Sequence, residues 1–262
     1  MDTLPYAVRC WRREICSLPG RRGKNEDVVR MEHVPFGGKG AFLFLACDGM
    51  GGLPHGKEAA ATCTDMAFQA AKNLLMKKGR SLFHRGTAEA LRRTLIAGAS
   101  GCGAGDGGST LVLLAFCLDR FHDGYRLLLA WSGDSRAYVM QGNTVLTCLT
   151  TDDHDQEGAL TSYYDAKLGV FAGDGLHVGE EILPHLPLCL GVTTDGLHKS
   201  CSHQELNAFL AWRLMEHAQD AGKAYGGFLE YNMSDNASCA FAMRRIMLPR
   251  EKLITLVQEE QP

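Results

Sequence analysis

Residues 41–52, Ala-Phe-Leu-Phe-Leu-Ala-Cys-Asp-Gly-Met-Gly-Gly, join an uninterrupted apolar run to a carboxylate that is followed by glycines. The apolar run does not alternate with polar residues, so it predicts a strand that is buried on both faces. Four further runs of this kind are Leu111–Leu118, Leu127–Trp131, Leu188–Thr193 and Ser238–Met243. Strands buried on both faces need covering layers, which helices can supply.

Three segments predict such helices. Lys57–Lys77 is rich in alanine and repeats an apolar face, and Thr87–Ala97 begins with Thr87 as a candidate N-cap. Ser202–Ala218 opens with Ser-His-Gln-Glu, the pattern of a capping box. Between these helices, Tyr125–Leu149 predicts a three-stranded meander with turns at residues 133–135 and 142–143. Antiparallel groups of strands separated by helices indicate an α+β fold, a β-sandwich flanked by helices.

The composition excludes several classes of protein. The 262 residues carry a formal net charge of -3, with 45% hydrophobic and 22% charged residues, which predicts one globular domain with a sizeable core. The net charge argues against a nucleic-acid binder that neutralises phosphates. The longest apolar run, Leu111–Leu118, is far shorter than the roughly 18 residues of a membrane span. The N-terminus lacks the apolar region of a signal peptide. We therefore expect neither nucleic acid nor a membrane as a partner.

The chain has ten cysteines, and no two of them have CxxC spacing. Most lie in apolar runs, as Cys47 and Cys117 do, which indicates single buried thiols. A domain of this size does not need disulfides as staples. We expect a cytoplasmic protein, or an effector delivered into a reducing cytosol.

Carboxylates recur where the predicted strands begin or end. Asp48 directly follows the first apolar run, and Asp195 follows the run that ends near Thr193. The full set of such carboxylates is Asp27, Asp48, Asp134, Asp195 and Asp235. Each of them alone is compatible with an ordinary turn. Five of them at strand boundaries predict that they converge in one cleft.

Converging carboxylates would repel one another and raise each other's pKa unless cations lay between them. Oxygen ligands without His or Cys favour Mg²⁺ or Mn²⁺ over Zn²⁺. Gly49 would let the backbone approach such an ion, with its carbonyl as a further ligand. Two ions roughly 3.5–4 Å apart can share a water, lower its pKa and clamp a phosphate. Arg22 could hold that phosphate by bidentate hydrogen bonds, or it could belong to a solvated basic patch with Arg21 and Lys24.

Six motifs occur in an order that resembles the metal-dependent serine/threonine protein phosphatases of type 2C, the PPM family. They are Arg22-Gly-Lys-Asn-Glu-Asp27, Asp48-Gly-Met-Gly-Gly52, Gly108-Ser-Thr110, Gly133-Asp-Ser-Arg-Ala-Tyr138, Thr193-Thr-Asp-Gly-Leu197 and Asp235-Asn236. Thr151-Asp-Asp-His154 fits a further T-x-D-H pattern of the family. Each motif is short, and only the ordered set is specific. The resemblance implies a catalytic domain over residues 1–246 and a C-terminal tail over residues 247–262.

The fold that the resemblance implies is a four-layer α-β-β-α sandwich, with two antiparallel sheets flanked by helices. The resemblance also implies two Mn²⁺ or Mg²⁺ ions. Asp48 would bridge both ions, and the Gly49 carbonyl would bind the first. Asp195 and Asp235 would bind the second ion.

Further roles follow from the same resemblance. Glu26 and Asp27 would orient metal-bound waters. Asp134 matches the residue that helps to hold a third, weaker metal in bacterial members of the family. Arg22 would hold the substrate phosphate. The expected catalytic residues are Asp48, Asp195, Asp235 and Arg22.

The implied reaction is the hydrolysis of phosphoserine or phosphothreonine in a protein. A water that bridges the two ions would attack phosphorus in line, without a phosphoenzyme intermediate. The expected partner is a phosphorylated protein, with a Ser/Thr kinase suggested by family analogy. Cys47 lies beside Asp48, but no H-C-x5-R arrangement accompanies it, so we reject a thiol-phosphatase mechanism.

The sequence departs from the family at two functional positions. Met50 stands where animal members have a histidine proposed as general acid, so we name no general acid. Residues 155–175 occupy the position of the flap beside the site, and residues 160–164 of it lack an arginine often found there. Substrate selection is therefore not transferred from the family.

Two other functions stay open. A pseudophosphatase would bind a phosphoprotein or a regulatory partner, and the presence of Asp48, Asp195 and Asp235 argues against it. A two-metal hydrolase of small phosphoesters or nucleotides is the second alternative. The chain has no G-x-x-x-x-G-K-[ST] loop, which argues against nucleotide binding.

Overall fold

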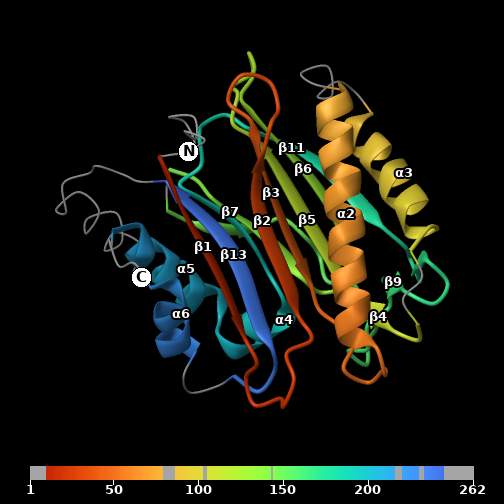
Figure 1. The fold of residues 1–262 in the computed structure, drawn as a ribbon. Coiled ribbons are helices and arrows are strands. Elements are labelled where there is room, and N and C mark those ends of the chain that lie inside the picture. The colour runs from red at the N-terminus through yellow and green to blue at the C-terminus, as the bar shows by residue number, and fades with distance from the viewer. Residues whose placement is uncertain are drawn as a thin grey trace, which may run out of the picture.

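The computed structural model describes residues 10–78, 86–102, 105–142, 144–215, 220–229 and 233–244, and Figure 1 shows their arrangement. The expected C-terminal tail, residues 247–262, lies outside the described residues. Sheet A contains, in spatial order, β1 (Trp11–Leu18), β13 (Ala237–Arg244), β12 (Cys189–Thr193), β7 (Arg136–Met140) and β8 (Leu146–Cys148). Sheet B contains β11 (His177–Leu183), β6 (Tyr125–Ser132), β5 (Leu111–Cys117), β3 (Ala41–Cys47) and β2 (Val28–Val34). All pairs of neighbouring strands in both sheets are antiparallel.

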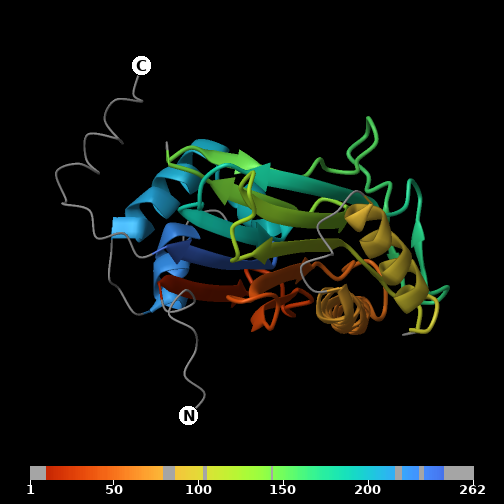
Figure 2. The same cartoon turned by 90° about the horizontal axis from the view of Figure 1, so that it is seen from above.

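Helices cover the outer face of each sheet. The helices α2 (Gly56–Lys78) and α3 (Thr87–Ala99) pack on sheet B, and α5 (His203–Met215) and α6 (Ala221–Leu229) pack on sheet A. Figures 1 and 2 place the two pairs of helices on opposite sides of the strands. The predicted four-layer α-β-β-α sandwich is confirmed.

The predicted doubly buried strands are confirmed, because three apolar cores separate the four layers. In β3 all seven residues are buried. Phe42 and Phe44 enter the core between the two sheets, and Leu43 and Leu45 enter the core beneath α2 and α3. This alternation follows from the period of two residues in a strand. It explains why an uninterrupted apolar run is needed at this position.

A small third sheet lies outside the two main ones. It contains β10 (Val170–Ala172), β9 (Tyr163–Asp165) and β4 (Gly108–Ser109). Two of its strands come from the predicted flap, residues 155–175, and the third directly precedes β5. Figure 1 shows β4 and β9 near one end of α2.

The predicted meander of Tyr125–Leu149 is wrong in its first turn. β6 pairs with β5 and β11 in sheet B, whereas β7 pairs with β12 and β8 in sheet A. Residues 133–135 therefore carry the chain from one sheet to the other. The Gly-Asp-Ser sequence suits either connection, because Gly133 supplies a positive φ of 103° and only the packing of the sheets decides between the two. The second predicted hairpin, between β7 and β8, is confirmed.

Of the two predicted helix N-termini, one is confirmed and one is wrong. The capping box at Ser202 is confirmed: Glu205 Oε2 accepts a hydrogen bond of 2.7 Å from the Ser202 backbone N, and Ser202 Oγ accepts one of 3.2 Å from the Glu205 N. The N-cap assigned to Thr87 is wrong. Gly86, in a left-handed conformation, is the N-cap of α3, and it offers no capping side chain. Thr87 is the first residue of the helix.

The structure leaves all ten cysteines as free thiols, six of them buried and four partly buried. Within the described residues, no helix is long and apolar enough to cross a membrane. Several elements were not predicted from the sequence, among them β11, α6 and the short strands of the third sheet. Two of the unpredicted elements bear on the site and its support. They are β1, whose run Trp-Arg-Arg-Glu-Ile is rich in charge, and the short helix α4 (Asp195–Ser200), which begins at a predicted site residue.

Candidate active site

Strand register in sheet B brings two of the predicted carboxylates together. Val28 of β2 is paired with Cys47 of β3. Asp27 precedes that pair and Asp48 follows it, so the two aspartates lie at the same end of the sheet. Each of the two carboxyl groups affects the pKa of the other.

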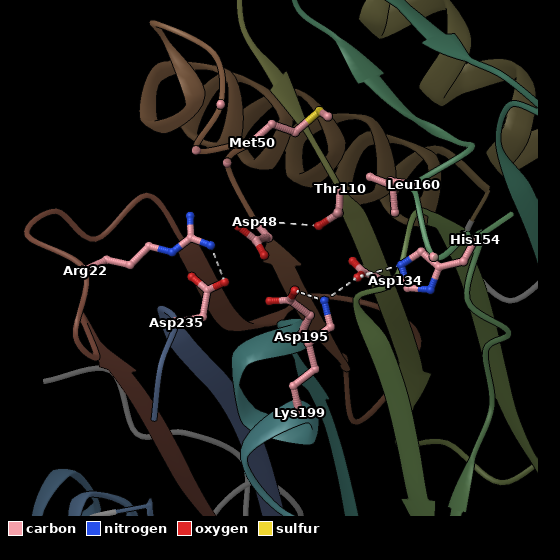
Figure 3. A pocket seen from close by; sticks show the side chains of 14 residues that line it. Arg22, Asp48, Met50, Thr110, Asp134, His154, Leu160, Asp195, Lys199 and Asp235 are labelled. Atoms are coloured by element: carbon pink, nitrogen blue, oxygen red, sulfur yellow. Dashed lines mark hydrogen bonds and ion pairs between the residues drawn. The ribbon is translucent and has the colours of Figure 1, made fainter. Parts of the chain in front are cut away.

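Sheet A places the other carboxylates at the same end of the sandwich. Thr193, the last residue of β12, lies between the first residues of β7 and the N-terminal part of β13. Asp195 follows β12, Asp134 precedes β7 and Asp235 precedes β13. Antiparallel pairing therefore gathers carboxylates that lie far apart in the sequence. Figure 3 shows Asp48, Asp134, Asp195 and Asp235 around one opening.

A cavity of about 300 Å³ opens over this end of the sheets. Its wall contains six of the predicted site residues, namely Arg22, Asp48, Gly49, Asp134, Asp195 and Asp235. The wall also includes Met50, Thr110, His154, Gly158, Leu160 and Lys199. Gly158 and Leu160 belong to the predicted flap. Glu26 and Asp27 are not part of the wall, and Asp27 is buried behind Asp48 with 2% of its surface exposed.

The Asp48 carboxyl group is surrounded by negative charge. Burial raises its pKa to about 11, together with the charges of Asp27 and Asp195. Burial likewise raises the pKa of Asp27 to about 6, against the hydrogen bond that Thr194 Oγ1 donates to Asp27 Oδ2 over 2.8 Å. For Asp195, burial raises the pKa, but hydrogen bonds from Asp48 and Lys199 outweigh burial and lower it. Without a cation, the Asp48 carboxyl group therefore keeps its proton at neutral pH.

These carboxylates suit divalent cations. Asp27 Oδ1 and Asp195 Oδ1 are buried and have no hydrogen-bond partner among the described residues. Buried, unpartnered carboxylate oxygens are costly unless a cation or a donor reaches them. Within the described part of the chain, no three His, Cys, Asp or Glu side chains already have the arrangement of a metal site. Metal binding would have to displace the proton that Asp48 keeps.

Two glycines let the backbone come close at the site. Gly49 pairs with Ser109 in a single bridge, and a Cβ on Gly49 would collide with the Gly56 carbonyl group. A Cβ on Gly196 would overlap the Asn236 carbonyl. Asp48 is fixed on both sides, because its N donates to Thr110 Oγ1 over 2.9 Å and its carbonyl accepts from Thr110 N over 2.9 Å.

Arg22 lies at the rim of the cavity but is not free. Its Nη2 is 2.6 Å from Asp235 Oδ2, and its side chain is 48% exposed. Gly51 lies beneath the guanidinium group, since a Cβ there would be 2.5 Å from Arg22 Nη1. Arg22 can therefore reach an anion in the cavity only while it shares its charge with Asp235.

Sequence reasoning missed Lys199. Its Nζ is 2.5 Å from Asp195 Oδ2 and 3.4 Å from Asp134 Oδ2, as Figure 3 shows. Burial lowers the pKa of Lys199, but Asp195 and Asp134 outweigh burial and raise it. The signal in the sequence was the spacing of four residues from Asp195, which places both side chains on one face of a helix. That signal requires α4, which was not predicted.

His154 belongs to the cavity wall, whereas His198 lies in α4 outside the wall. His154 Nε2 is 3.1 Å from Asp134 Oδ2. Burial lowers the pKa of His198 to about 4, so this ring is neutral at pH 7. The T-x-D-H motif indicated His154, and nothing in the sequence indicated His198.

The chain has no matching family model and no significant match among curated protein sequences. Solved structures are similar to it. One is the serine/threonine phosphatase Stp1 from Staphylococcus aureus, with 19% identity, 88% of this chain and 94% of that chain covered, and a TM-score of 0.65. Another is the Mycobacterium tuberculosis serine/threonine phosphatase PstP/Ppp, with 18% identity, 90% and 99% covered, and a TM-score of 0.63.

A third similar structure is the catalytic domain of the serine threonine protein phosphatase PstP in complex with two manganese ions. It has 20% identity, covers 89% of this chain and 97% of that chain, and gives a TM-score of 0.61. Coverage of 88–90% of this chain and 94–99% of the similar chains means that the likeness extends over the whole sandwich and not over one motif. The chain has the α+β sandwich fold of the bacterial serine/threonine phosphatases.

Proposed function

We propose that this protein is a member of the PPM family and a metal-dependent protein phosphatase that hydrolyses phosphoserine or phosphothreonine. The observation that carries the proposal is the cavity where Asp48, Asp134, Asp195 and Asp235 meet, with a buried Asp195 oxygen that has no hydrogen-bond partner among the described residues. The fold shared with serine/threonine phosphatases supports it.

The chain supplies ligands for Mn²⁺ or Mg²⁺. Asp48 with the Gly49 carbonyl would hold the first ion, and Asp48, Asp195 and Asp235 would hold the second. Two divalent cations bound there would activate water and neutralise the charge of a phosphate. One similar phosphatase was solved with two manganese ions, which favours Mn²⁺ as the first metal to test.

The remaining roles fall to residues around these ligands. Asp27, buried behind Asp48, and Glu26, beside Gly51 near Arg22, would orient water. Arg22 would hold the phosphate of the substrate from the rim, with Asp235 as its partner. Thr110 fixes the Asp48 backbone, so the carboxylate is held in place before substrate binds.

Direct transfer of the phosphoryl group to water fits the position of Cys47. This thiol is completely buried and belongs to the core beneath α2 and α3, away from the cavity. A thiol in that core cannot attack phosphorus. The proposed reaction therefore proceeds without a phosphocysteine.

The substrate is proposed to be a phosphorylated protein, with a Ser/Thr kinase as one candidate. The cavity of about 300 Å³ has room for a phosphorylated side chain, and the sequence has no G-x-x-x-x-G-K-[ST] loop for a nucleotide. A cytoplasmic site of action is consistent with ten free thiols. The alternative of a binding module without activity shares the same fold, so activity has to be measured.

The experiment compares p-nitrophenyl phosphate and a phosphothreonine peptide with Mn²⁺ and with EDTA. We expect phosphate release from both substrates with Mn²⁺ and none with EDTA. The Asp48→Asn variant is the negative control. Activity that survives EDTA would contradict the metal mechanism, and bound Mn²⁺ without turnover would favour the binding module. Faster hydrolysis of nucleotides than of the peptide would favour the small-phosphoester alternative.

A further inference from the structure

The chain places a cation of its own among the site carboxylates. Lys199 Nζ lies between Asp195 Oδ2 and Asp134 Oδ2, at 2.5 and 3.4 Å (Figure 3). The two carboxylates belong to different segments, one in α4 and one in the crossing from β6 to β7. The ammonium group therefore joins them across the site.

The position of Lys199 is set by the local structure. Lys199 is four residues after Asp195 in α4, so the helix holds both side chains on one face. Asp134 is fixed from its other side by His154, whose Nε2 is 3.1 Å from the same Oδ2 atom. The Asp134 side chain is 6% exposed, so this oxygen is shielded and already has two partners.

The two oxygens of Asp195 face different surroundings. Oδ2 contacts Lys199, whereas Oδ1 is buried and has no hydrogen-bond partner in the described part of the chain. Asp48 and Asp195 belong to the wall of the same cavity, and their carboxyl groups lie side by side in Figure 3, so the two groups can share a cation. The free coordinating capacity therefore lies toward Asp48, and not toward Asp134.

We propose that the ammonium group of Lys199 takes the place of a divalent cation between Asp195 and Asp134, so that this protein binds its metal ions at Asp48 and Asp195 without recruiting Asp134. The inference rests on the proposed function, in that the carboxylates bind Mn²⁺. It replaces the expectation that Asp134 helps to hold a third ion. A divalent cation at Asp134 would meet a like charge at short range in a partly buried site, where such repulsion is strong.

Two other lysines that contact an aspartate do not have this position. Lys57, at the start of α2, donates to the backbone carbonyl of Asp27 over 2.6 Å and not to a carboxylate. Lys223 in α6 pairs with Asp220 at 3.7 Å and is 89% exposed. Lys223 therefore serves as a matched control, since it forms an acid–lysine pair on a helix outside the cavity.

The test counts bound metal and does not depend on activity. Equilibrium dialysis against Mn²⁺, with metal analysis of the protein, is carried out on the wild type, Lys199→Gln and Lys223→Gln. We expect Lys199→Gln to bind one more Mn²⁺ per chain than the wild type at saturation, and Lys223→Gln to match the wild type. Anomalous scattering at the manganese edge from Lys199→Gln crystals should place the additional ion beside Asp134.

A double variant assigns the additional site. Lys199→Gln/Asp134→Asn should lose the ion that Lys199→Gln gains. Equal Mn²⁺ counts in the wild type and Lys199→Gln would overturn the role of Lys199 and leave the proposed function intact. The absence of bound Mn²⁺ from every variant, each folded by circular dichroism, would overturn the proposed function and this inference with it.

Discussion

Two groups of buried charge in this molecule differ in how their charges are matched. In the first, Glu14 of β1 lies between Arg213 of α5, which hydrogen-bonds both of its carboxylate oxygens, and Arg12, whose Nε is 2.9 Å away. In the second, Asp27, Asp48 and Asp195 lie together, and among the described residues only Lys199 forms an ion pair with one of them.

The difference separates a structural role from a chemical one. The side chains of Glu14 and Arg213 are 3% and 0% exposed, and each has an oppositely charged partner. They tie β1 to α5. Near Asp48, carboxylates outnumber cations, and burial with the neighbouring acids raises the Asp48 pKa to about 11. Buried charge that is matched stabilises a fold, whereas buried charge of one sign indicates a site that awaits a ligand.

The largest expected effect comes from breaking the matched group. Glu14→Ala should lower the free energy of unfolding by about 3–5 kcal/mol, because it leaves the Arg213 guanidinium buried without its partner. Urea unfolding measures this loss. Glu89→Ala, which removes an exposed glutamate paired with Arg92, is the matched control and should cost under about 0.5 kcal/mol. A similar small loss for both variants would show that the buried pair contributes nothing.

The next largest effect concerns activity and comes from the second group, that of Asp27, Asp48 and Asp195. Asp48→Asn should lower kcat by about 10²–10³-fold, because it removes a carboxylate that holds the charge stabilising the transition state. Its stability in EDTA should not fall, since a neutral side chain replaces a carboxyl group that is already protonated. Asp65→Asn, on the exposed face of α2, is the control and should keep full activity. Normal turnover by Asp48→Asn would refute the assignment of the site.

The third prediction concerns pH and metal. The pKa of Asp48 is raised to about 11 and that of Asp27 to about 6, whereas unfolded carboxyl groups ionise near 4. Above about pH 4 the unfolded chain therefore releases protons that the folded chain keeps. The free energy of unfolding that these two groups contribute consequently falls as pH rises. In EDTA, the stability of Asp48→Asn relative to the wild type should increase from pH 5 to pH 8.

Urea unfolding at the two pH values measures that difference, and comparison with the variant cancels the titration of other groups. Saturating Mn²⁺ should stabilise the wild type by about 2.7 kcal/mol at 100 times its Kd. Asp48→Asn should gain less than the wild type. A relative stability that stays constant between pH 5 and pH 8 would show that the carboxylates do not share protons in the folded chain.

The smallest effect tests the exposed pair of Arg22 and Asp235. Arg22→Ala should raise KM for a phosphopeptide about fivefold to tenfold, which corresponds to about 1–1.4 kcal/mol, with a smaller change in kcat. Because this pair is solvent-exposed, its loss should cost at most about 1 kcal/mol of stability. Arg21→Ala provides the neighbouring control. An unchanged KM would return Arg22 to the solvated basic patch that was the alternative interpretation.

The pattern of apolar runs was sufficient for the fold class and for most of the inner strands. A run such as residues 41–47 indicates a strand with both faces covered, because every position is apolar and the run is short. The edge strand β1 was not predicted, because its buried Glu14 is paired with Arg213, about two hundred positions later in the sequence. No local pattern could report that pairing.

The crossing at residues 133–135 shows the same limit. Gly-Asp-Ser has the chemistry of a turn, but whether the following strand joins the same sheet or the opposite one depends on packing between the sheets. The crossing places Asp134 over the site, where a hairpin would have placed it at the edge of one sheet. Lys199 was missed for a related reason. It lies in α4, which was not predicted, and α4 begins where Gly196 packs closely against the Asn236 carbonyl, a contact that only the tertiary structure makes.

The sequence by itself determined which residue types stand at the strand ends, because apolar periodicity fixes where strands stop and the chain order fixes which carboxylates follow. It therefore determined Asp48, Asp195 and Asp235 as candidates. Only the tertiary structure decided how they are charged. Antiparallel registers set the contacts among Asp27, Asp48 and Asp195, and those contacts decide which carboxyl group keeps a proton. The structure also decided that Lys199 pairs with Asp134 and Asp195, and that Arg22 shares its charge with Asp235. Electrostatic interactions fall off with distance and depend on burial, and both quantities exist only in the folded chain.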